Sequence, residues 1–459
     1  MKLGMISLGC AKNLIDSELF LGVAKKYDLE ITNNLKEANI IVVNTCGFIE
    51  SAKKEAIDTI LEVTENKKDK IVIAMGCLVE RYLDDLKKSL PEVDIYFPIK
   101  DYKNIDELFQ KLLGSTKTYK MNYEDRLITT LPHSAYLRIS EGCNNRCSYC
   151  AIPLIRGPFT SRPFESLILE AKYLAKCGVK EITLIGQDTT RYGTDLKEGK
   201  YLQDLLHEIS NIPGVSLVRV LYLYPDEITT NSKFILTDES NFVNDISSKA
   251  NKTTDEVINE IKNNPKVAKY FDIPIQHASN KILKAMNRRG SKEFIVDLIA
   301  KIRKQIPDVT IRTTLIVGFP TENNQDFKEL VDFVEEIKFN RLGVFTYSDE
   351  EDTKGYLMKP KVSETTMKKR LNAIMQIQNG ISNKLNHEYI GKTYSAIIDS
   401  YDSQANKYIV RNEAYAPDDV DGFIYATNDS GLKVNTGDIV KIKITDANSY
   451  DLFAKIIKD

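Results

Sequence analysis

The chain has 459 residues, 42% of them hydrophobic and 28% charged, and its formal net charge is −2 at pH 7. This length accommodates about three domains with sizeable cores, and the near-neutral charge excludes a strongly basic protein that grips nucleic acid over its whole surface. Because no apolar run approaches the roughly 18 residues of a membrane span and no signal peptide is recognisable, we expect a cytoplasmic protein without a membrane partner.

The first hundred residues alternate between short apolar runs and helical patterns. The runs Leu3–Leu8, Ile40–Thr45 and Ile71–Gly76 are continuous and rich in β-branched residues, which is typical of buried parallel strands. Helical patterns at Asn13–Tyr27 and Glu50–Thr64 separate them. This alternation predicts an open parallel α/β sheet.

A cysteine follows each of these three strands, at Cys10, Cys46 and Cys77. The carboxyl ends of parallel strands meet at one edge of a sheet, so we expect the three thiols to converge there. A single cysteine at a strand end is usually just a small buried residue. A cysteine after each of the three predicted strands is better explained as a set of metal ligands.

Three further cysteines, Cys143, Cys147 and Cys150, have the spacing C-x3-C-x2-C. Three thiolates so close together can hold three corners of a cubane iron–sulfur cluster and leave the fourth iron without a protein ligand. A structural zinc site is the alternative, but it needs a fourth ligand, and no histidine lies between His133 and His207.

Repeated strand and helix patterns follow this cysteine loop. The strands are expected at Glu181–Ile185, Leu217–Tyr222, Tyr270–Ile275 and Thr310–Val317, and the helices at Phe164–Cys177, Leu202–Ile209, Ser291–Gln305 and Asn324–Ile337. This βα repeat predicts a parallel, partial barrel whose active site gathers at the carboxyl ends of the strands.

Two parts of this region are expected to have no chemical role. The seventh cysteine, Cys177, falls on a predicted amphipathic helix and is expected to be a core residue. The polar segment Asn231–Asn264, with a helix-like stretch at Thr253–Lys262, is expected to be a surface insertion.

From Tyr389 on, short alternating strands are broken by turn signals such as Asp421-Gly422, which predicts a small antiparallel β-barrel. Residues 390–459 contain eight lysines and arginines and eleven acidic residues. Such a surface suits a basic protein better than RNA, so direct binding of transfer RNA is not expected.

The motifs together resemble the radical S-adenosylmethionine (SAM) methylthiotransferases. The cysteine loop is similar to the radical SAM signature, and the segments Leu8–Glu18 and Asn44–Ile49 are similar to the N-terminal domain of that family. The family attaches a methylthio group to an unactivated carbon. The resemblance therefore implies two [4Fe–4S] clusters and SAM as cofactors, together with external donors of electrons and sulfur.

The resemblance also implies roles for individual residues. The auxiliary cluster would be held by Cys10, Cys46 and Cys77, and the radical SAM cluster by Cys143, Cys147 and Cys150. Tyr149 would lie beside the adenine of SAM, and Gly186 and Gln187 would lie near its methionine part. Ile316, Gly318 and Glu322 belong to a strand end that approaches adenine and ribose. No residue is assigned as a catalytic acid or base.

Two segments favour one branch of the family. Gly9–Leu14 and Gly186–Gly193 are similar to the branch that modifies the β-carbon of an aspartate in small-subunit ribosomal protein S12. The alternatives are the branch that modifies an adenosine of transfer RNA, and a non-catalytic iron–sulfur protein that senses redox state or assists ribosome assembly. The expected domains are an N-terminal methylthiotransferase domain (1–125), a radical SAM domain (130–375) and an OB-like TRAM domain (389–459).

Overall fold

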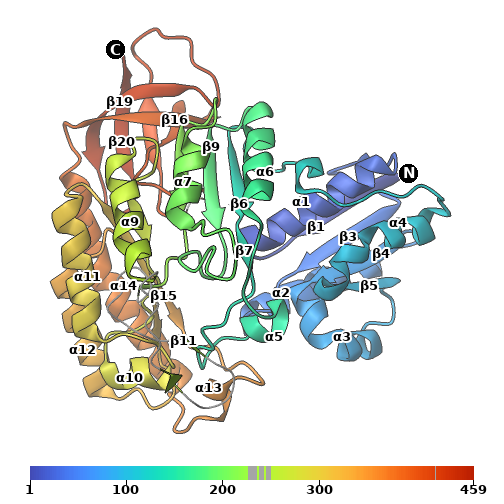
Figure 1. The fold of residues 1–459 in the computed structure, drawn as a ribbon, viewed down its shortest axis with the longest axis horizontal. Helices are drawn as coiled ribbons and strands as arrows, with labels where there is room; N and C mark the ends of the chain where they lie inside the picture. The colour runs from blue at the N-terminus through green and yellow to red at the C-terminus, as the bar shows by residue number, and fades with distance from the viewer. Residues whose placement is uncertain (226–234, 237–241, 244–249, 419, 459) are drawn as a thin grey trace.

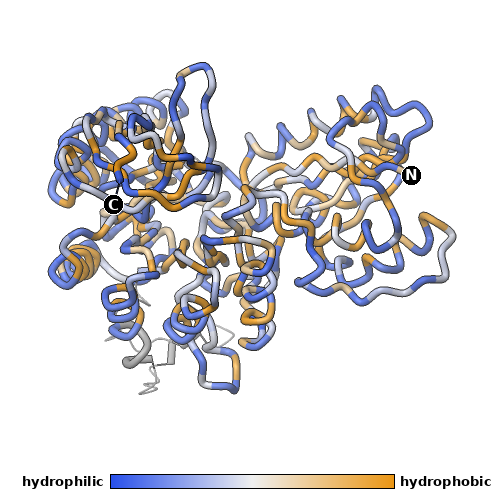
Figure 2. The backbone as a smooth tube through the Cα atoms, turned by 90° about the horizontal axis from the view of Figure 1, so that it is seen from above, coloured by the Kyte–Doolittle hydropathy of each residue, from blue (hydrophilic) through white to orange (hydrophobic). Residues whose placement is uncertain are grey.

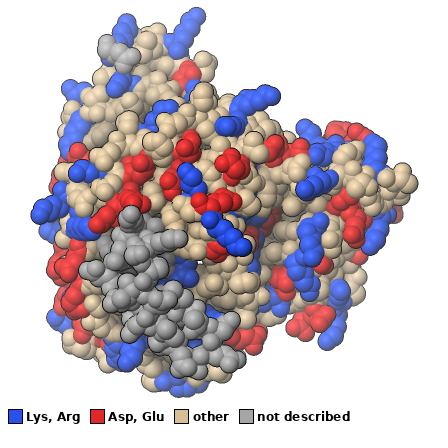
Figure 3. Space-filling model, in the orientation of Figure 1, with Lys and Arg blue, Asp and Glu red and all other residues tan. Residues whose placement is uncertain are grey.

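A computed structural model describes residues 1–225, 235–236, 242–243, 250–418 and 420–458. The chain forms three α/β or β units: an N-terminal parallel sheet, a central partial barrel and a small C-terminal barrel (Figure 1). No helix of the described residues is long and apolar enough to cross a bilayer. Lysine, arginine and acidic side chains are interspersed over the face in Figure 3, as the near-neutral composition predicts.

The N-terminal unit is a five-stranded parallel sheet, as predicted. Its strands follow the order β2-β1-β3-β4-β5. They are β1 (Lys2–Ser7), β2 (Glu30–Ile31), β3 (Ile40–Thr45), β4 (Ile71–Gly76) and β5 (Ile95–Pro98). One face is covered by α1 (Ala11–Lys26) and α4 (Ile105–Leu113), and the other by α2 (Glu50–Glu65) and α3 (Cys77–Ser89). Because both faces are covered, the strands read as continuous apolar runs, which Figure 2 shows as orange segments.

The central unit is the predicted partial barrel. Its six parallel strands are β6 (Ser134–Arg138), β9 (Glu181–Ile185), β10 (Leu217–Val220), β13 (Tyr270–Asp272), β14 (Thr310–Val317) and β15 (Arg341–Thr346). They form two halves, β6-β9-β10 and β13-β14-β15, which a bridge between Val218 and Val267 joins. Outside them lie α6 (Phe164–Lys176), α7 (Leu202–Ser210), α9 (Ala250–Asn263), α11 (Lys292–Gln305), α12 (Asn324–Ile337) and α14 (Glu364–His387) (Figure 1).

Short elements connect these units. They are β7 (Ser140–Glu141), α5 (Ile152–Arg156), β8 (Thr160–Ser161), β11 (Ile235–Leu236), β12 (Phe242–Val243), α10 (Asn280–Ala285) and α13 (Lys354–Leu357). Strand β10 ends two residues earlier than predicted because Tyr222 takes a left-handed backbone conformation, with φ of 63°. Such a conformation in a bulky residue marks a constrained site.

The expectation of a surface insertion at Asn231–Asn264 is wrong for its helical part. Helix α9 buries Val257, Ile258 and Ile261 in the hydrophobic core of the central barrel, where it packs beside α7. It is therefore the helix that connects β10 to β13. The remainder of the segment lies largely outside the described residues.

The expectation that Cys177 is a core residue is also wrong, because its side chain is exposed. Helix α6 ends at Lys176, and Cys177 caps it just before Gly178 turns the chain away with φ of 96°. We expect Cys177→Ser to change the free energy of unfolding by no more than about 0.5 kcal/mol, as for other surface substitutions, and to leave the iron content unchanged. Urea unfolding and iron analysis test this, and a loss of iron would contradict it.

The C-terminal unit is the predicted small barrel; it is closed and five-stranded, and one of its strand pairs is parallel and not antiparallel as expected. Its strands follow the order β16-β17-β18-β20-β19. They are β16 (Thr393–Asp402), β17 (Lys407–Arg411), β18 (Ile424–Thr427), β19 (Ile439–Ala447) and β20 (Leu452–Ile457). Alternate residues of these strands fill the interior of the barrel with small and branched side chains.

Several acidic residues of this barrel contact the central unit of the same chain, and so they do not form a surface for a partner protein. Asp399 lies 2.7 Å from His133 Nε2 and pairs with Arg411 at 3.0 Å. Asp421 is buried and accepts a hydrogen bond of 2.7 Å from the Tyr270 hydroxyl. The acidic surplus counted in the sequence therefore overstates the negative charge that the barrel presents to solvent.

We expect Asp399→Asn to lower the free energy of unfolding by about 2 kcal/mol at pH 7, because Arg411 would lose a buried partner. Burial opposes ionisation, but the hydrogen bond with His133 and the charge of Arg411 lower the pKa of Asp399 below its usual value. A depressed pKa stabilises the fold above the unfolded value of about 3.9 and ceases to do so as the pH falls through the folded value.

Urea unfolding of wild type and Asp399→Asn between pH 8 and pH 4 tests this prediction. The difference in unfolding free energy should stay constant from pH 8 to about pH 5 and shrink only near or below pH 4. Asp429→Asn is the matched control, because Asp429 forms only an exposed pair with Lys455. Equal losses in the two variants would contradict the anchoring role of Asp399.

Candidate functional site

The structure brings Cys10, Cys46 and Cys77 to one edge of the N-terminal sheet. Strands β1, β3 and β4 are neighbours, and a cysteine follows the carboxyl end of each. A Cβ atom added to Gly9 would stand 2.8 Å from the Cβ of Cys46 and 3.2 Å from its sulfur. Glycine at position 9, with φ of 88°, therefore allows the Cys10 loop to lie against Cys46.

The three thiols differ in their electrostatic environment. Burial raises the pKa of Cys77 to about 12 and also raises the pKa of Cys46. Burial acts in the same direction on Cys10, but the charge of Lys12 and a backbone hydrogen bond from Asn13 outweigh it, so the pKa of Cys10 is lowered. Cys10 also keeps an exposed surface. A thiolate is the form that ligates metal, so Cys10 is the thiol best prepared for that role.

The second set, Cys143, Cys147 and Cys150, lies in the loop between β7 and α5. Burial raises the pKa of Cys143 to about 12 and that of Cys150 still further, so these thiols are neutral until a metal binds. The loop is fastened to the barrel, because the Ser148 amide donates to the Met286 carbonyl at 2.9 Å and the Asn145 side chain donates to Asp188 at 2.7 Å.

Among the described residues, no three Cys, His, Asp or Glu side chains stand close enough to hold a single metal ion. A cubane cluster differs from a single ion because its four irons and four sulfides separate the cysteine ligands. Two sets of three thiols match the three-cysteine ligand sets that hold such a cluster.

Arg156, at the end of α5, connects the two cysteine sets. Its guanidinium donates to the Asn13 side chain at 2.7 Å and lies 3.4 Å from the Cys77 sulfur. It also pairs with Asp16 at 2.8 Å and with Glu141 at 3.2 Å. The guanidinium therefore joins an N-terminal ligand loop to the segment that leads into the second cysteine loop.

Arg138 strengthens this junction. It pairs with the same two carboxylates, at 2.6 Å to Asp16 and 3.0 Å to Glu141. The side chains of Asp16 and both arginines are almost fully buried. The sequence analysis missed this network, because its two pairs with Asp16 join residues more than a hundred positions apart and leave no local pattern.

The residues expected near the methionine part of SAM, Gly186 and Gln187, lie directly after β9. A Cβ atom on Gly186 would stand 2.6 Å from the Ser140 hydroxyl, so only glycine leaves room there. Gln187 donates to Glu141 at 2.6 Å. The Ser140 hydroxyl and the Gln187 carbonyl are buried and have no hydrogen-bond partner among the described residues. Two unpaired acceptors fit a ligand that brings an ammonium group.

Tyr149 and Ile316 lie in one apolar cluster with Ile282, Met286 and Phe319, although they come from distant parts of the sequence. This cluster gives the cysteine loop and the end of β14 a shared apolar surface. An adenine ring is the kind of planar, mostly apolar group that such a surface accepts.

Gly318 and Glu322 form a turn directly after β14. The amides of Gly318 and Phe319 donate to one Glu322 oxygen at 2.6 and 3.0 Å, and Arg370 donates to the other at 2.8 Å. Gly318 has φ of 79°, which requires glycine, and a Cβ there would meet Met367 at 2.3 Å. Both oxygens of Glu322 are thus engaged by the turn and by α14, so this carboxylate positions the turn.

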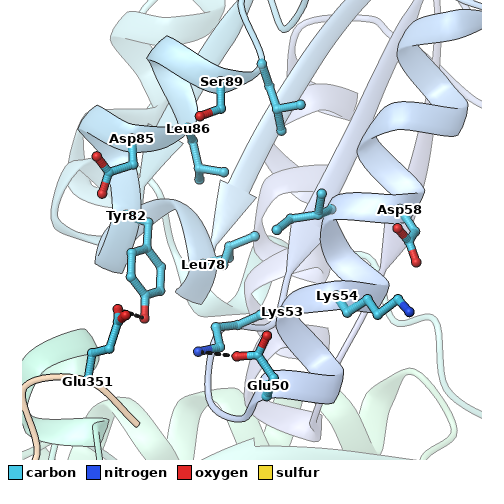
Figure 4. Close-up of a pocket in the computed structure, with 12 residues that line it drawn as sticks. Glu50, Lys53, Lys54, Asp58, Leu78, Tyr82, Asp85, Leu86, Ser89 and Glu351 are labelled. Carbon is cyan, nitrogen blue, oxygen red and sulfur yellow. Dashed lines mark hydrogen bonds and ion pairs between the residues drawn. The ribbon is translucent and has the colours of Figure 1, made fainter.

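A separate cavity of about 430 Å³ lies between α2 and α3 (Figure 4). Its apolar floor includes Leu78 and Leu86, and Tyr82 at its edge hydrogen-bonds Glu351 from the loop after β15. None of its lining residues is a predicted site residue. The cavity is therefore not the place where the two cysteine sets and the expected SAM contacts gather.

Three family descriptions match successive parts of the sequence. Residues 2–98 match Uncharacterized protein family UPF0004, residues 137–334 match the radical SAM superfamily, and residues 390–457 match the TRAM domain. These ranges coincide with the parallel sheet, the partial barrel and the closed barrel.

Full-length relatives carry a more specific description. The chain is 47% identical to the ribosomal protein uS12 methylthiotransferase RimO of Clostridium novyi (strain NT), over 99% of this chain and 98% of that protein. It is 45% identical to the protein of the same name from Acetivibrio thermocellus, over 100% and 99% of the two chains.

Solved structures support the fold alone. The cobalamin-dependent SAM radical enzyme OxsB, in its apo form, has a TM-score of 0.53 and 12% identity, over 82% of this chain and 56% of that chain. The radical SAM methyltransferase TsrM from Kitasatospora setae, with tryptophan and a SAM analogue bound, has a TM-score of 0.51 and 13% identity, over 75% and 72%.

Proposed function

We propose that this chain, which belongs to the radical SAM family of ribosomal protein uS12 methylthiotransferases, adds a methylthio group to the β-carbon of an aspartate in ribosomal protein uS12. The observation that carries the proposal is identity of 44% or more, over nearly the whole of both chains, to proteins of that name. The arrangement of the cysteines supports this proposal, because one set belongs to the N-terminal unit and the other to the central unit, and Arg156 of the central unit lies against Cys77 of the N-terminal set. The reaction would take place in the cytoplasm.

The cofactors would be two [4Fe–4S] clusters and SAM, which together supply electron transfer, hydrogen abstraction and the methylthio group. One cluster would be held by Cys10, Cys46 and Cys77, and the other by Cys143, Cys147 and Cys150. An external electron donor and an external sulfur donor would complete the system.

The chain's own residues would bind and orient SAM. The unpaired oxygens of Ser140 and Gln187 would accept hydrogen bonds from the amino group, and Gly186 would leave room for close approach. Tyr149 and Ile316 would pack against the adenine. Gly318 would present its backbone to the ribose, while Glu322 keeps that turn in place.

Mass spectrometry of ribosomal protein uS12 from cells that lack the gene tests the proposal. The protein should lose one methylthio group at an aspartate, and the group should return when the gene is restored but not when the restored gene carries Cys143→Ala. Loss of methylthioadenosine from transfer RNA, with uS12 unaffected, would assign the enzyme to the other branch. No change in either molecule would favour a redox or assembly role.

A further inference from the structure

Lys12 is a buried cation to which no carboxylate of the described residues is paired, although its charge acts on the neighbouring Cys10 thiol. Only 8% of it is exposed, and its ammonium nitrogen lies 3.6 Å from the centre of the Tyr222 ring. Within the part of the chain that the structure describes, no carboxylate or carbonyl oxygen lies within ion-pair or hydrogen-bond distance of this nitrogen.

The neighbouring buried cations are different in this respect. Arg138 and Arg156 each pair with both Asp16 and Glu141. A buried charge without a counter-charge is costly, so a protein that keeps one usually does so for a ligand. Among the described residues of this junction, Lys12 is thus a cation whose charge no carboxylate pairs with, unlike Arg138 and Arg156.

Two units of the protein fix the position of Lys12. Its backbone belongs to the first turn of α1, two residues after Cys10. Its ammonium lies over Tyr222, at the carboxyl end of barrel strand β10. The aromatic face stabilises the ammonium by a cation–π interaction, and no described residue accepts a hydrogen bond from it.

The Tyr222 ring is itself held in place by its strained backbone. The Tyr222 amide donates to Asp272 at 2.9 Å, and its carbonyl accepts from the Thr189 amide at 3.2 Å and from the Thr189 hydroxyl at 3.1 Å. Asp272 in turn pairs with Arg312 at 3.2 Å. These contacts keep a bulky residue at φ of 63°, a constraint that is typical of functional sites.

We propose that Lys12 binds the side-chain carboxylate of the substrate aspartate. This inference rests on the proposed function. The carboxylate carbon of aspartate is bonded directly to the β-carbon. A cation that fixes the position of the carboxylate therefore also fixes the position of the reacting carbon to within one bond length. Lys12 thereby makes the enzyme select a carboxylate over the isosteric amide.

The test measures binding of purified uS12 in two forms: the native protein, and a variant with asparagine at the aspartate that wild-type enzyme modifies. Iron-loaded enzyme is used, as wild type, Lys12→Met and Lys12→Arg. Lys25→Met is the matched control, because Lys25 is an exposed residue of the same helix about 20 Å away. Affinity is measured by titration calorimetry without reductant, so that no turnover occurs.

Wild type and Lys25→Met should bind the aspartate form about 30-fold more tightly than the asparagine form. Lys12→Met should bind both forms equally, and Lys12→Arg should keep most of the preference. Equal binding of both forms by wild type would overturn the inference, and so would an undiminished preference in Lys12→Met. If Lys12→Met fails to load iron, Lys12→Gln replaces it under the same criteria.

Three further outcomes distinguish a failure of this inference from a failure of the proposed function. If the clusters of Lys12→Met change their reduction potential while the preference for aspartate persists, Lys12 serves the cluster at Cys10 and the inference is wrong. If wild type does not modify uS12 at all, the proposed function fails. If wild type modifies uS12 and Lys12→Met keeps the preference, only the role of Lys12 fails.

Discussion

Replacing Cys143, Cys147 and Cys150 together by alanine is expected to leave about four irons per chain after anaerobic reconstitution, against about eight in wild type. The remaining cluster would be held by the N-terminal set, which comes from another unit of the protein. Modification of uS12 should stop completely, because the open iron at the second set would be lost. Iron analysis and mass spectrometry of uS12 measure the two effects.

The reciprocal variant sharpens this experiment. Replacing Cys10, Cys46 and Cys77 by alanine should also leave about four irons, yet this variant should still cleave SAM when a reductant is supplied. The control is Cys177→Ala, which should keep about eight irons, since the exposed Cys177 belongs to neither set. Wild-type protein that saturates at about four irons would refute the two-cluster proposal.

We expect Arg156→Met to lower the free energy of unfolding of the iron-free chain by about 3 kcal/mol. The change removes one cation from a buried network and leaves Asp16 and Glu141 with Arg138 alone. It also removes the hydrogen bond to Asn13, which joins the N-terminal unit to α5. Urea unfolding under reducing conditions measures the loss.

Lys328→Met provides the comparison for Arg156→Met. Lys328 pairs with Asp332 at 3.0 Å, but both side chains are more than half exposed. Exposed pairs one helical turn apart contribute about 0.3 to 0.5 kcal/mol, so this variant should lose far less stability. Similar losses in the two variants would mean that the network at Arg156 does not hold the two units together.

The sequence predicted the fold wherever local pattern and burial agree. The runs at Ile40–Thr45, Ile71–Gly76 and Thr310–Val317 are strands with those same bounds, and the first two are mostly apolar because helices cover both faces of their sheet. The grouping of Cys10, Cys46 and Cys77 was also predictable, since neighbouring parallel strands end at one edge. Their role as cluster ligands stays a prediction.

The errors have specific physical causes. Cys177 falls on the apolar pattern of α6, but the helix ends one residue before it and the side chain reaches solvent. The polar composition of Asn231–Asn264 concealed the apolar stripe of Val257, Ile258 and Ile261. Counting acids by segment could not reveal that Asp399 and Asp421 face the central unit, because long-range pairing is set by the tertiary fold.

The candidate site residues also divide into those that the sequence indicated and those that it could not indicate. The family resemblance implied that Tyr149, Gly186 and Gly318 approach a ligand, and this stays a prediction; the structure places Tyr149 in an apolar cluster and leaves no room for a Cβ atom at Gly186 and Gly318 without a shift of a neighbouring side chain. Spacing could not indicate that Glu322 turns its carboxylate toward two backbone amides and Arg370. Nor could it show the contacts of Arg156 and Lys12, which join different units.

The two cysteine sets differ in the chain entropy that each must overcome. Cys143, Cys147 and Cys150 close a very short loop, so little ordering separates the unfolded segment from a binding arrangement. Cys10, Cys46 and Cys77 are separated by long stretches of chain, and only the pairing of β1, β3 and β4 brings them together. Local unfolding of one of these strands therefore dismantles the N-terminal set while the other persists. Under the proposed function, heat or oxidative damage should then produce a chain that still binds SAM but no longer holds the auxiliary cluster.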